Sequence, residues 1–269
     1  MYIELIKKVL IDLHRIGRTE YKPLYSNNKR WMVKLLISFD SLIRKKDIAI
    51  CRVIRSSYEN RAEGIDWPAN ADSMIGLKRL DNIEYCINKI IDDKIAGDFI
   101  ETGVWRGGAT IFMKAVLKIN NINDKIIWLA DSFEGLPKPN EKKYTADKND
   151  SHHLKSELVV TLEQVRSNFE NYDLLDDNIK FLKGWFKDTL PTAPIEKLSL
   201  LRLDGDMYES TIDALNNLYP KLSKGGFVII DDWGPVEGCK QAVNDYRKDH
   251  GITEKIEQID WSGVYWRKD

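Results

Sequence analysis

The stretch GDFIETGVWRGGATIFM, residues 97–113, indicates how this chain folds. Its segment DFIETG (98–103) is a short apolar run that ends at a glycine, which is typical of a buried strand. The segment 107–119 that follows has apolar residues at helical spacing. A strand that leads into a helix through a glycine-rich turn is the repeating unit of α/β proteins.

The same alternation continues towards the C-terminus. Short apolar runs alternate with helical patterns, and most of the connections between them are short. This order predicts a doubly wound, mostly parallel sheet that helices cover on both faces. The expected strands are 126–131, 178–184, 198–206 and 225–232, and the expected helices are 158–171, 210–222 and 236–250.

Two other segments have their own features. The last two runs, 255–260 and 263–268, lie too close together for a helical crossover. We therefore expect them to pair as a hairpin, which adds an antiparallel strand at the end of the sheet. The stretch 137–157 is polar and longer than most loops, so it is either a functional lid or a disordered insertion.

The composition excludes several classes of protein. With 269 residues, 43% of them hydrophobic, the chain suffices for one sizeable domain with an appendage. A net charge of −1 gives no sign of a nucleic-acid partner. The three cysteines are scattered, which argues against a disulfide scaffold and a zinc ribbon. No apolar run approaches the ~20 residues that cross a bilayer, so we expect a soluble, cytoplasmic protein.

The N-terminal region differs from the rest in charge. Residues 1–60 contain 13 Lys or Arg and 6 Asp or Glu, and their apolar positions recur at helical spacing. We expect a basic appendage of two or three helices at 1–60, ahead of a main domain at 61–269. Its basic faces are either merely solvated or a surface that meets a membrane or an anionic, lipid-linked glycan. Apolar helices of this kind also favour a homo-oligomer.

Acidic residues and glycines follow four of the expected strands. In a doubly wound sheet, ligands bind beyond the carboxyl ends of the strands. Asp is also a common helix cap and turn residue, so a single acid there says little. Four strand ends together are harder to explain by capping, and they carry Glu101 with Gly103, then Asp131, then Asp204 with Asp206, then Asp231 with Asp232.

Two of these strand ends point to an adenosine-type ligand. Gly103 opens a turn in which the backbone can approach a ligand, ahead of a helix N-terminus with free N–H groups. Asp131 ends the next strand, where an acid binds ribose hydroxyls in nucleotide-binding sheets. The pattern does not distinguish NAD from S-adenosylmethionine.

The other two strand ends point to a cation. Asp204 and Asp206 leave an extended strand on the same face, and Asp231 and Asp232 end the following strand. Carboxylates gathered at one point repel one another unless a cation lies among them. Oxygen ligands suit Mg²⁺, Ca²⁺ or Mn²⁺. The alternative is that these acids pair with Arg202, Arg79 or backbone amides.

Histidines and aromatic residues are less informative. His152 and His153 lie in the polar 137–157 stretch, and we interpret them, like His14 and His250, as surface or capping residues. Trp185 follows an expected strand in GWFKDTLP, where it either stacks on an adenine or packs as a buried aromatic residue.

Six stretches of the chain form a recognisable set. They are DWPANADSMIGLKRLDNI (66–83), GDFIETGVWRGGATIFM (97–113), ADSFEGLP (130–137), FLKGWFKDTLPTAP (181–194), LRLDGDMYESTIDALNNLYPKL (201–222) and GGFVIIDDW (225–233). Together they resemble the macrocin O-methyltransferase family, whose members methylate sugar hydroxyls of macrolide and aminocoumarin antibiotics with S-adenosylmethionine and a metal ion. The likeness runs through 61–269 and includes 2–13, whereas 16–58 departs from the shorter antibiotic-tailoring members.

The resemblance implies a class I Rossmann-like methyltransferase fold and a role for each matching residue. Asp206 matches the general base of the family, and 137–157 matches a lid that orders when ligands bind. The positions that match Mg²⁺ ligands are Asp204, Asp231 and Asp232. Those that match the cofactor site are Met74, Glu101, Gly103, Asp131, Ser132, Gly184 and Trp185.

Two other functions stay open from the residues alone. Asp204-Gly205-Asp206 is also a DxD motif, which holds a metal against a nucleotide-sugar in many glycosyltransferases. The second acidic pair and the upstream glycine turn weigh against that interpretation. A non-catalytic binding module built on the basic N-terminal helices is the third possibility, but it leaves the acidic cluster unexplained.

Overall fold

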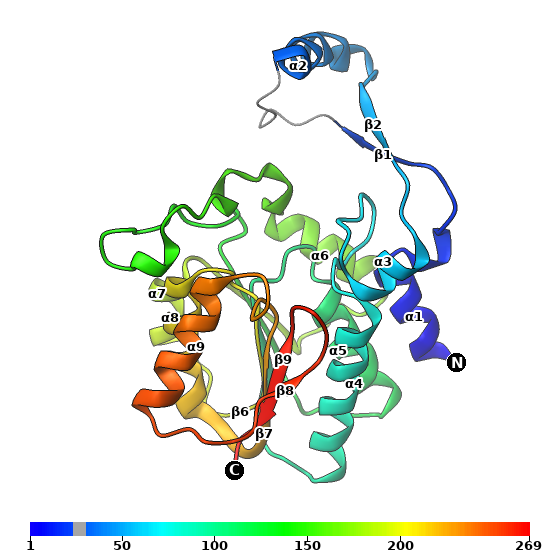
Figure 1. Cartoon of the computed structure of the whole chain (residues 1–269). Helices are drawn as coiled ribbons and strands as arrows, with labels where there is room; N and C mark the ends of the chain where they lie inside the picture. The colour runs from blue at the N-terminus through cyan, green and yellow to red at the C-terminus, as the bar shows by residue number, and fades with distance from the viewer. Residues whose placement is uncertain (24–30) are drawn as a thin grey trace.

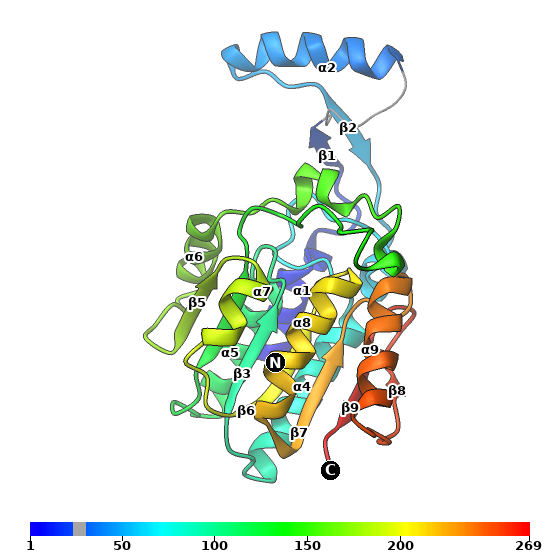
Figure 2. The same ribbon diagram turned by 90° about the vertical axis from the view of Figure 1, so that its left-hand side faces the viewer.

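The computed structural model describes residues 1–23 and 31–269, and its centre is a seven-stranded sheet of order β5-β4-β3-β6-β7-β9-β8. The strands from β5 to β7 are parallel, and β9 runs antiparallel to β7 (Figures 1 and 2). β8 pairs antiparallel with β9, so the prediction of a C-terminal hairpin is confirmed. The strands are β3 (Asp98–Thr102), β4 (Ile127–Asp131), β5 (Ile179–Lys183), β6 (Leu198–Leu203), β7 (Leu222–Ile230), β8 (Glu257–Gln258) and β9 (Val264–Arg267).

Helices cover both faces of this sheet. Neighbouring side chains along a strand point to opposite faces, and Phe99 and Ile100 of β3 accordingly lie in two different hydrophobic cores. This is the doubly wound arrangement that the alternating pattern predicted. The first face packs on α1 (Tyr2–Leu10), α4 (Leu77–Asp92), α5 (Gly108–Ile119) and α6 (Leu162–Asn171), and the second on α7 (Phe186–Thr189), α8 (Tyr208–Leu218) and α9 (Glu237–Asp249).

The first helix belongs to the same core as α4 and α5. Ile3, Ile6 and Leu10 of α1 are buried at helical spacing. The Lys7 ammonium is almost fully buried at 3% exposure and lies 2.6 Å from Asp81 of α4, which compensates its burial. The division of the chain at residue 60 stays a prediction, and α1 shares the core of the following domain.

Between α1 and α4 the chain forms an arm that projects from the body (Figures 1 and 2). We call residues 20–23 and 31–54 the arm: it contains β1 (Glu20–Pro23), α2 (Trp31–Ile43) and β2 (Cys51–Ile54), and α3 (Tyr58–Glu63) follows it. β1 and β2 pair antiparallel. The expectation of two or three helices in 1–60 did not include this hairpin. β1 and β2 have only four residues each and show no clear alternation of apolar and polar residues, so their sequence does not predict a strand.

The fold places one long segment over the carboxyl ends of the central strands. Residues 137–157 are the lid segment, and they contain short 3₁₀ turns at Thr145–Asp147 and His152–Leu154. Asp147 accepts hydrogen bonds from the backbone N–H groups of Tyr208 (2.6 Å) and Glu209 (3.1 Å), which fixes the lid segment to the N-terminus of α8. Within the described residues, no helix is long and apolar enough to cross a membrane.

Candidate active site

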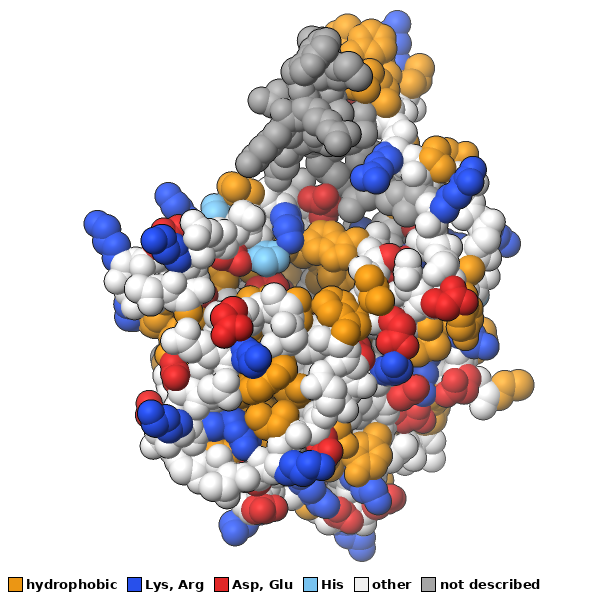
Figure 3. Space-filling model, in the orientation of Figure 1, with side chains coloured by type: hydrophobic (Ala, Val, Ile, Leu, Met, Phe, Trp, Pro, Cys, Tyr) orange, Lys and Arg blue, Asp and Glu red, His pale blue; other side chains and the backbone are white. Residues whose placement is uncertain are grey.

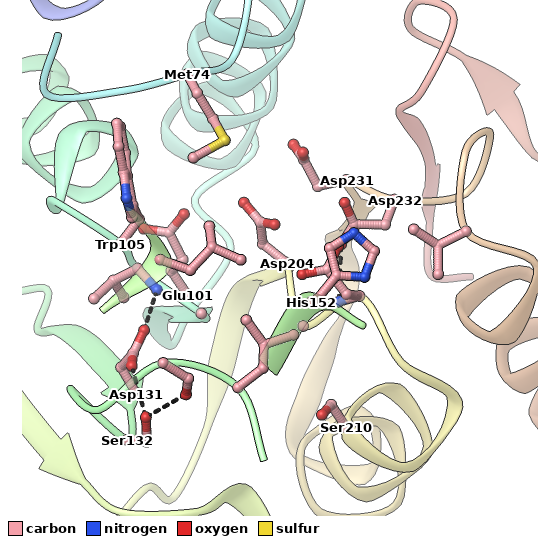
Figure 4. A pocket seen from close by; sticks show the side chains of 18 of the residues that line it. Met74, Glu101, Trp105, Asp131, Ser132, His152, Asp204, Ser210, Asp231 and Asp232 are labelled. Carbon is pink, nitrogen blue, oxygen red and sulfur yellow. Dashed lines mark hydrogen bonds between the residues drawn. The ribbon is translucent and has the colours of Figure 1, made fainter. Parts of the chain in front are cut away.

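A cavity of about 540 Å³ lies at the carboxyl ends of β3, β4, β6 and β7, below the lid segment (Figure 4). Eleven residues were predicted from the sequence as site residues, and all eleven line this cavity. They are Met74, Glu101, Gly103, Asp131, Ser132, Gly184, Trp185, Asp204, Asp206, Asp231 and Asp232.

Gly103 is required where β3 ends. Its φ is +83°, and a Cβ built there would lie 1.8 Å from the carbonyl oxygen of Asp204. A residue with a side chain would force the ends of β3 and β6 apart. The glycine thus allows the turn after β3 to lie directly against the loop that carries Asp204 and Asp206.

Asp131 holds the glycine turn in shape. Its carboxylate accepts hydrogen bonds from the backbone N–H groups of Val104 and Phe133, both at 2.7 Å. Burial raises the pKa of Asp131, and these backbone hydrogen bonds oppose that shift. The Ser132 hydroxyl donates to the carbonyl of Gly135 at 2.6 Å. The ends of β3 and β4 are therefore joined through one carboxylate.

Two arginines lie beneath the acidic residues. Arg202 of β6 is 1% exposed and donates hydrogen bonds to Glu101, Asp204 and Asp231. Arg79 of α4 donates to the other oxygen of Asp231 at 2.5 Å. The pairing that the sequence left open as an alternative therefore exists, and Asp231 is its centre.

The arginines compensate the acids unequally. Burial alone would raise the pKa of Asp231, but Arg202 and Arg79 bring it below its ordinary value. Burial raises the pKa of Glu101 to about 8, and burial with the neighbouring Asp231 raises that of Asp204 to about 7. The two guanidinium groups face more carboxyl groups than they can neutralise, and the raised pKa values of Glu101 and Asp204 reflect this.

Asp232 shows where the uncompensated charge lies. Its carboxylate accepts a hydrogen bond from the backbone N–H of Asp206 at 3.1 Å. Burial and the charges of Asp206 and Asp204 raise the pKa of Asp232 well above its ordinary value. Oxygen atoms of Asp204, Asp231 and Asp232 lie within 4.8 Å of one another. A donor set of carboxylate oxygens with excess negative charge fits a hard divalent cation.

Asp206 adopts a backbone conformation that is unusual for a residue with a side chain. Its φ is +58°, in the left-handed region that Asp tolerates better than most residues. Such conformations persist where the surrounding structure determines them, often at functional sites. Burial raises the pKa of Asp206, and the nearby His152 opposes that shift.

His152, which we interpreted as a surface or capping residue, is partly exposed and also lines the cavity. It comes from the lid segment, and its Nδ1 lies 2.6 Å from the carboxylate of Asp150. Figure 4 shows its ring beside the acidic side chains. The one sequence signal that could have indicated this position is Asp150, which lies two residues before His152 in the long polar stretch 137–157.

Aromatic side chains form much of the remaining wall. Trp67, Trp105 and Trp261 line the cavity together with the predicted Trp185. Trp105 has a φ of +47°, and its Nε1 donates to the carbonyl of Glu157 at 2.9 Å, so the turn after β3 contacts the end of the lid segment. The sequence analysis assigned a site role only to Trp185, although Trp105 also lies in the glycine-rich turn after an expected strand.

Comparisons with known proteins agree with this geometry. The sequence model of the family Macrocin-O-methyltransferase (TylF) matches residues 1–268. Demethyldecarbamoylnovobiocin O-methyltransferase of Streptomyces niveus is 53% identical over 211 residues, 78% of this chain and 80% of that protein. A tetracenomycin-C 4'-O-methyltransferase of Streptomyces olivaceus, named for a dimethoxy-rhamnosyl substrate, is 53% identical over 208 residues, 77% of this chain and 79% of that protein.

A solved structure extends the likeness to the whole fold. The O-methyltransferase NovP superposes with a TM-score of 0.83 at 44% identity, over 99% of this chain and 98% of that chain. The methyltransferase fold predicted from the sequence motifs is confirmed. The chain belongs to the macrocin-O-methyltransferase family, and it is a methyltransferase.

Proposed function

We propose that this protein transfers a methyl group from S-adenosylmethionine to a sugar hydroxyl of a glycosylated natural product or glycan, with the help of a divalent cation. One observation carries the proposal. A glycine turn fixed by Asp131 and a carboxylate cluster from two further strand ends share one cavity of about 540 Å³. A nucleoside site and a cation site side by side serve a reaction between a nucleoside cofactor and a hydroxyl group.

The cofactor half is the part of the cavity between β3 and β5. S-adenosylmethionine supplies a methyl group on a positively charged sulfur. Gly103 allows close approach of the backbone, Asp131 and Ser132 offer oxygens for the ribose, and Glu101 lies at the end of β3. We assign the remaining contacts of S-adenosylmethionine to Met74, Gly184 and Trp185, which line the same cavity.

The cation half is the cluster of Asp204, Asp231 and Asp232, for which we expect Mg²⁺. Asp204, Asp231 and Asp232 would hold a cation there, and it would lower the pKa of an acceptor hydroxyl, whose proton is otherwise held too tightly at neutral pH. Arg202 and Arg79 hold Asp231 in place from below. This division assigns the arginines to orientation of Asp231, whose two oxygens each accept from an arginine and keep a further lone pair for the cation, with Asp204 and Asp232 as the other ligands.

Asp206 is the proposed general base. It lines the cavity beside the cluster but is not needed as a ligand. Burial raises its pKa, which brings a carboxylate closer to the range in which it accepts a proton from a hydroxyl group. Its strained backbone fixes where the carboxylate points.

One relative's name supports a sugar acceptor, since it names a rhamnosyl tetracenomycin, and two others are named for demethyldecarbamoylnovobiocin and mycinamicin III. Tryptophan side chains in the wall suit the apolar face of a sugar ring. We further expect a cytoplasmic protein and a homo-oligomer. Peripheral contact of residues 1–60 with a membrane or a lipid-linked glycan is the lesser expectation.

Calorimetric titration tests the proposal. Metal-stripped protein is titrated with S-adenosylmethionine and separately with UDP-sugars, each with and without Mg²⁺. Micromolar binding of S-adenosylmethionine without binding of UDP-sugars supports the methyl transfer proposed here. Metal-dependent binding of a UDP-sugar alone would mean that Asp204-Gly205-Asp206 serves as a glycosyltransferase DxD motif, and the proposal would be wrong.

A further inference from the structure

The turn that joins β8 to β9 contains a buried carboxylate close to the acidic cluster. We call residues 260–263 the hairpin turn, and it lies against the start of α4 and the end of β7 (Figure 1). The side chain of Asp260 is 0% exposed. One of its oxygens accepts a hydrogen bond from Nε of Arg79 at 2.9 Å, and the other accepts from the backbone N–H groups of Ser262 (2.9 Å) and Gly263 (2.7 Å). Asp260 is not among the described residues that line the cavity, so it acts there only through its neighbours.

Arg79 connects Asp260 with the acidic cluster. Its Nη1 donates to Asp231 at 2.5 Å, and its Nη2 donates to the carbonyl of Gly64 at 3.3 Å. A guanidinium group is planar, and its N–H donors have fixed directions. Because Asp260 and Gly64 hold two of the three nitrogens, the direction in which the third one meets Asp231 is fixed as well. The orientation of Asp231 therefore depends on a carboxylate that does not contact it.

The hairpin turn also holds the main chain of Asp231. The Ser262 hydroxyl donates to the carbonyl of Asp231 at 2.5 Å, and the backbone N–H of Gly234 donates to the carbonyl of Ser262 at 2.8 Å. A Cβ on Gly234 would lie 2.1 Å from the carbonyl oxygen of Trp261, so the loop after β7 lies directly against the turn. Side chain and main chain of Asp231 are thus positioned by the same short turn.

Trp261 separates this ion pair from the open side of the cavity. The face of the molecule below the arm is hollowed, and hydrophobic side chains lie around the hollow (Figure 3). Trp261 lines the cavity, and its Nε1 donates to the carbonyl of Glu63 at 2.9 Å. The guanidinium carbon of Arg79 lies 5.9 Å from the centre of the Trp261 ring. Arg79 is therefore only 5% exposed although it lies next to the cavity.

The stability of the β8–β9 hairpin does not require this buried charge. β9 is paired with β7 over four residues, and Val264 and Trp266 are buried in the second core. A buried ion pair adds little net stability, because the loss of hydration of both groups offsets their attraction, and apolar residues often replace it without loss. What the pair of Asp260 and Arg79 adds is a defined orientation of the group that Arg79 contacts.

We propose that Asp260 is a positioning residue of the cation site: through Arg79 it fixes the orientation of Asp231, and it thereby sets how tightly and how selectively the site binds a divalent cation. The inference rests on the cation site of the proposed function. Mg²⁺ requires near-ideal octahedral geometry, whereas Ca²⁺ accepts flexible arrangements of oxygens. A firmly oriented Asp231 therefore favours Mg²⁺ over Ca²⁺.

Binding of Mn²⁺ to the metal-stripped full chain tests the proposal without cofactor or acceptor. Electron paramagnetic resonance measures the free Mn²⁺, and Mg²⁺ and Ca²⁺ are added as competitors. Asp260→Asn keeps an oxygen for the N–H groups of Ser262 and Gly263, but its amide turns a donor towards the Nε–H of Arg79. We expect the Kd of Mn²⁺ and of Mg²⁺ to rise about 10–100-fold and that of Ca²⁺ to rise less. Calorimetric affinity for S-adenosylmethionine is expected to stay unchanged.

Asp93→Asn is the matched control. Asp93 pairs at 2.5 Å with Arg267 of β9, at a position that is 41% exposed. The variant removes the same charge from an ion pair of the same hairpin, so the Kd of each cation is expected to stay unchanged. An equal rise of the Kd of Mn²⁺ in both variants would assign the effect to net charge alone and would overturn the proposal.

A double-mutant cycle shows whether Asp260 acts through Arg79. Arg79→Lys keeps the positive charge but cannot hold three partners in fixed directions. If Asp260 acts through Arg79, the double variant binds Mn²⁺ no more weakly than Arg79→Lys alone. Losses that add in the double variant would mean that the two residues act independently, and the proposal would be wrong.

Ser262→Ala keeps the proposal testable if Asp260→Asn does not fold. It changes no charge and removes one hydrogen bond to the main chain of Asp231, so we expect the Kd of Mn²⁺ to rise about 2–10-fold at an unchanged melting temperature. A wild type that binds no Mn²⁺ would remove the cation site of the proposed function, and this inference with it. A wild type that binds Mn²⁺ as Asp260→Asn does, or a variant that loses affinity for Mn²⁺ and S-adenosylmethionine equally, overturns this inference alone.

Discussion

Arg202 and Asp231 form an ion pair that is closed to solvent, with side chains 1% and 6% exposed, between β6 and the end of β7. The same guanidinium group also binds Glu101 and Asp204. One arginine therefore holds acids from three neighbouring strand ends. Asp231 is oriented by Arg202 and Arg79 before any ligand arrives, which makes the acidic cluster preorganised.

Replacing this arginine is expected to destabilise the fold. Arg202→Met leaves the buried Glu101 and Asp231 and the partly exposed Asp204 without their shared guanidinium group, and breaking a buried pair in this way costs about 3–5 kcal/mol. Urea unfolding at pH 7 measures the loss. Lys180→Met, at an exposed position of β5, is the control and is expected to change the free energy of unfolding by less than about 0.5 kcal/mol. Equal stability of the Arg202→Met variant and the wild type would contradict the role of Arg202.

The general base is tested by Asp206→Asn. The variant keeps the shape of the side chain but cannot take up a proton, so we expect kcat to fall by about 10²–10⁴. Calorimetric affinity for S-adenosylmethionine is expected to stay unchanged. Asp188→Asn, at an exposed position of α7, is the matched control and retains full turnover. Normal turnover of Asp206→Asn would exclude this residue as the base.

The contact between the ends of β3 and β6 is tested by Gly103→Ala. A methyl group there meets the carbonyl oxygen of Asp204 and adds backbone strain at positive φ, so we expect a loss of at least about 2 kcal/mol. Gly251→Ala separates the two effects, because Gly251 also has a positive φ but nothing lies within 4 Å of the added Cβ. If both variants lose the same stability, the close approach is not what requires the glycine.

The lid segment is expected to respond to pH through Asp150 and His152. Their hydrogen bond raises the pKa of His152, and it lowers that of Asp150 against the opposing effect of burial. The contribution of His152 is complete below its unfolded value of about 6.5 and is lost as pH rises through the higher folded value. The contribution of Asp150 is present above about 3.9 and is lost as pH falls through its lower folded value.

Hydrogen exchange of peptides from the lid segment, corrected for intrinsic rates, measures this response. Protection is expected to be greatest in weakly acidic solution and to decrease as pH rises above neutrality. His152→Gln is expected to remove the pH dependence, whereas His14→Gln, which lies outside the lid segment and contacts Lys8 and Asp12, keeps it. A lid segment whose protection does not change over that range would show that the pair does not hold it.

Much of the fold was predictable from local sequence patterns. The alternation of short apolar runs with helical periods specified the order of strands and helices, and the spacing of 255–260 and 263–268 specified a hairpin. The acids at strand ends, such as Asp131 and Asp204, were visible because parallel strands bring their carboxyl ends to one edge. The order of elements and the hairpin depend on residues that are close in sequence, and the shared position of the acids follows from the geometry of every parallel sheet.

Other features depend on side chains that meet only in three dimensions. The sequence offered Arg202 and Arg79 as possible partners of the acids, but that Arg202 contacts acids from three strand ends depends on β6 lying between β3 and β7. His152 reaches the cavity because Asp147 fastens the lid segment to α8. The hairpin of the arm was missed because four-residue strands show no period.

The register of β3 and β6 has a consequence for how the protein folds. Glu101 and Arg202 are paired directly across these strands although they lie 101 positions apart in the chain. Closing so long a loop costs entropy before its contacts form, so this pairing belongs to the slow, late part of folding. The carboxylates gather only when that step is complete. A cation that binds them therefore recognises the finished fold, and it shifts the folding equilibrium by mass action alone.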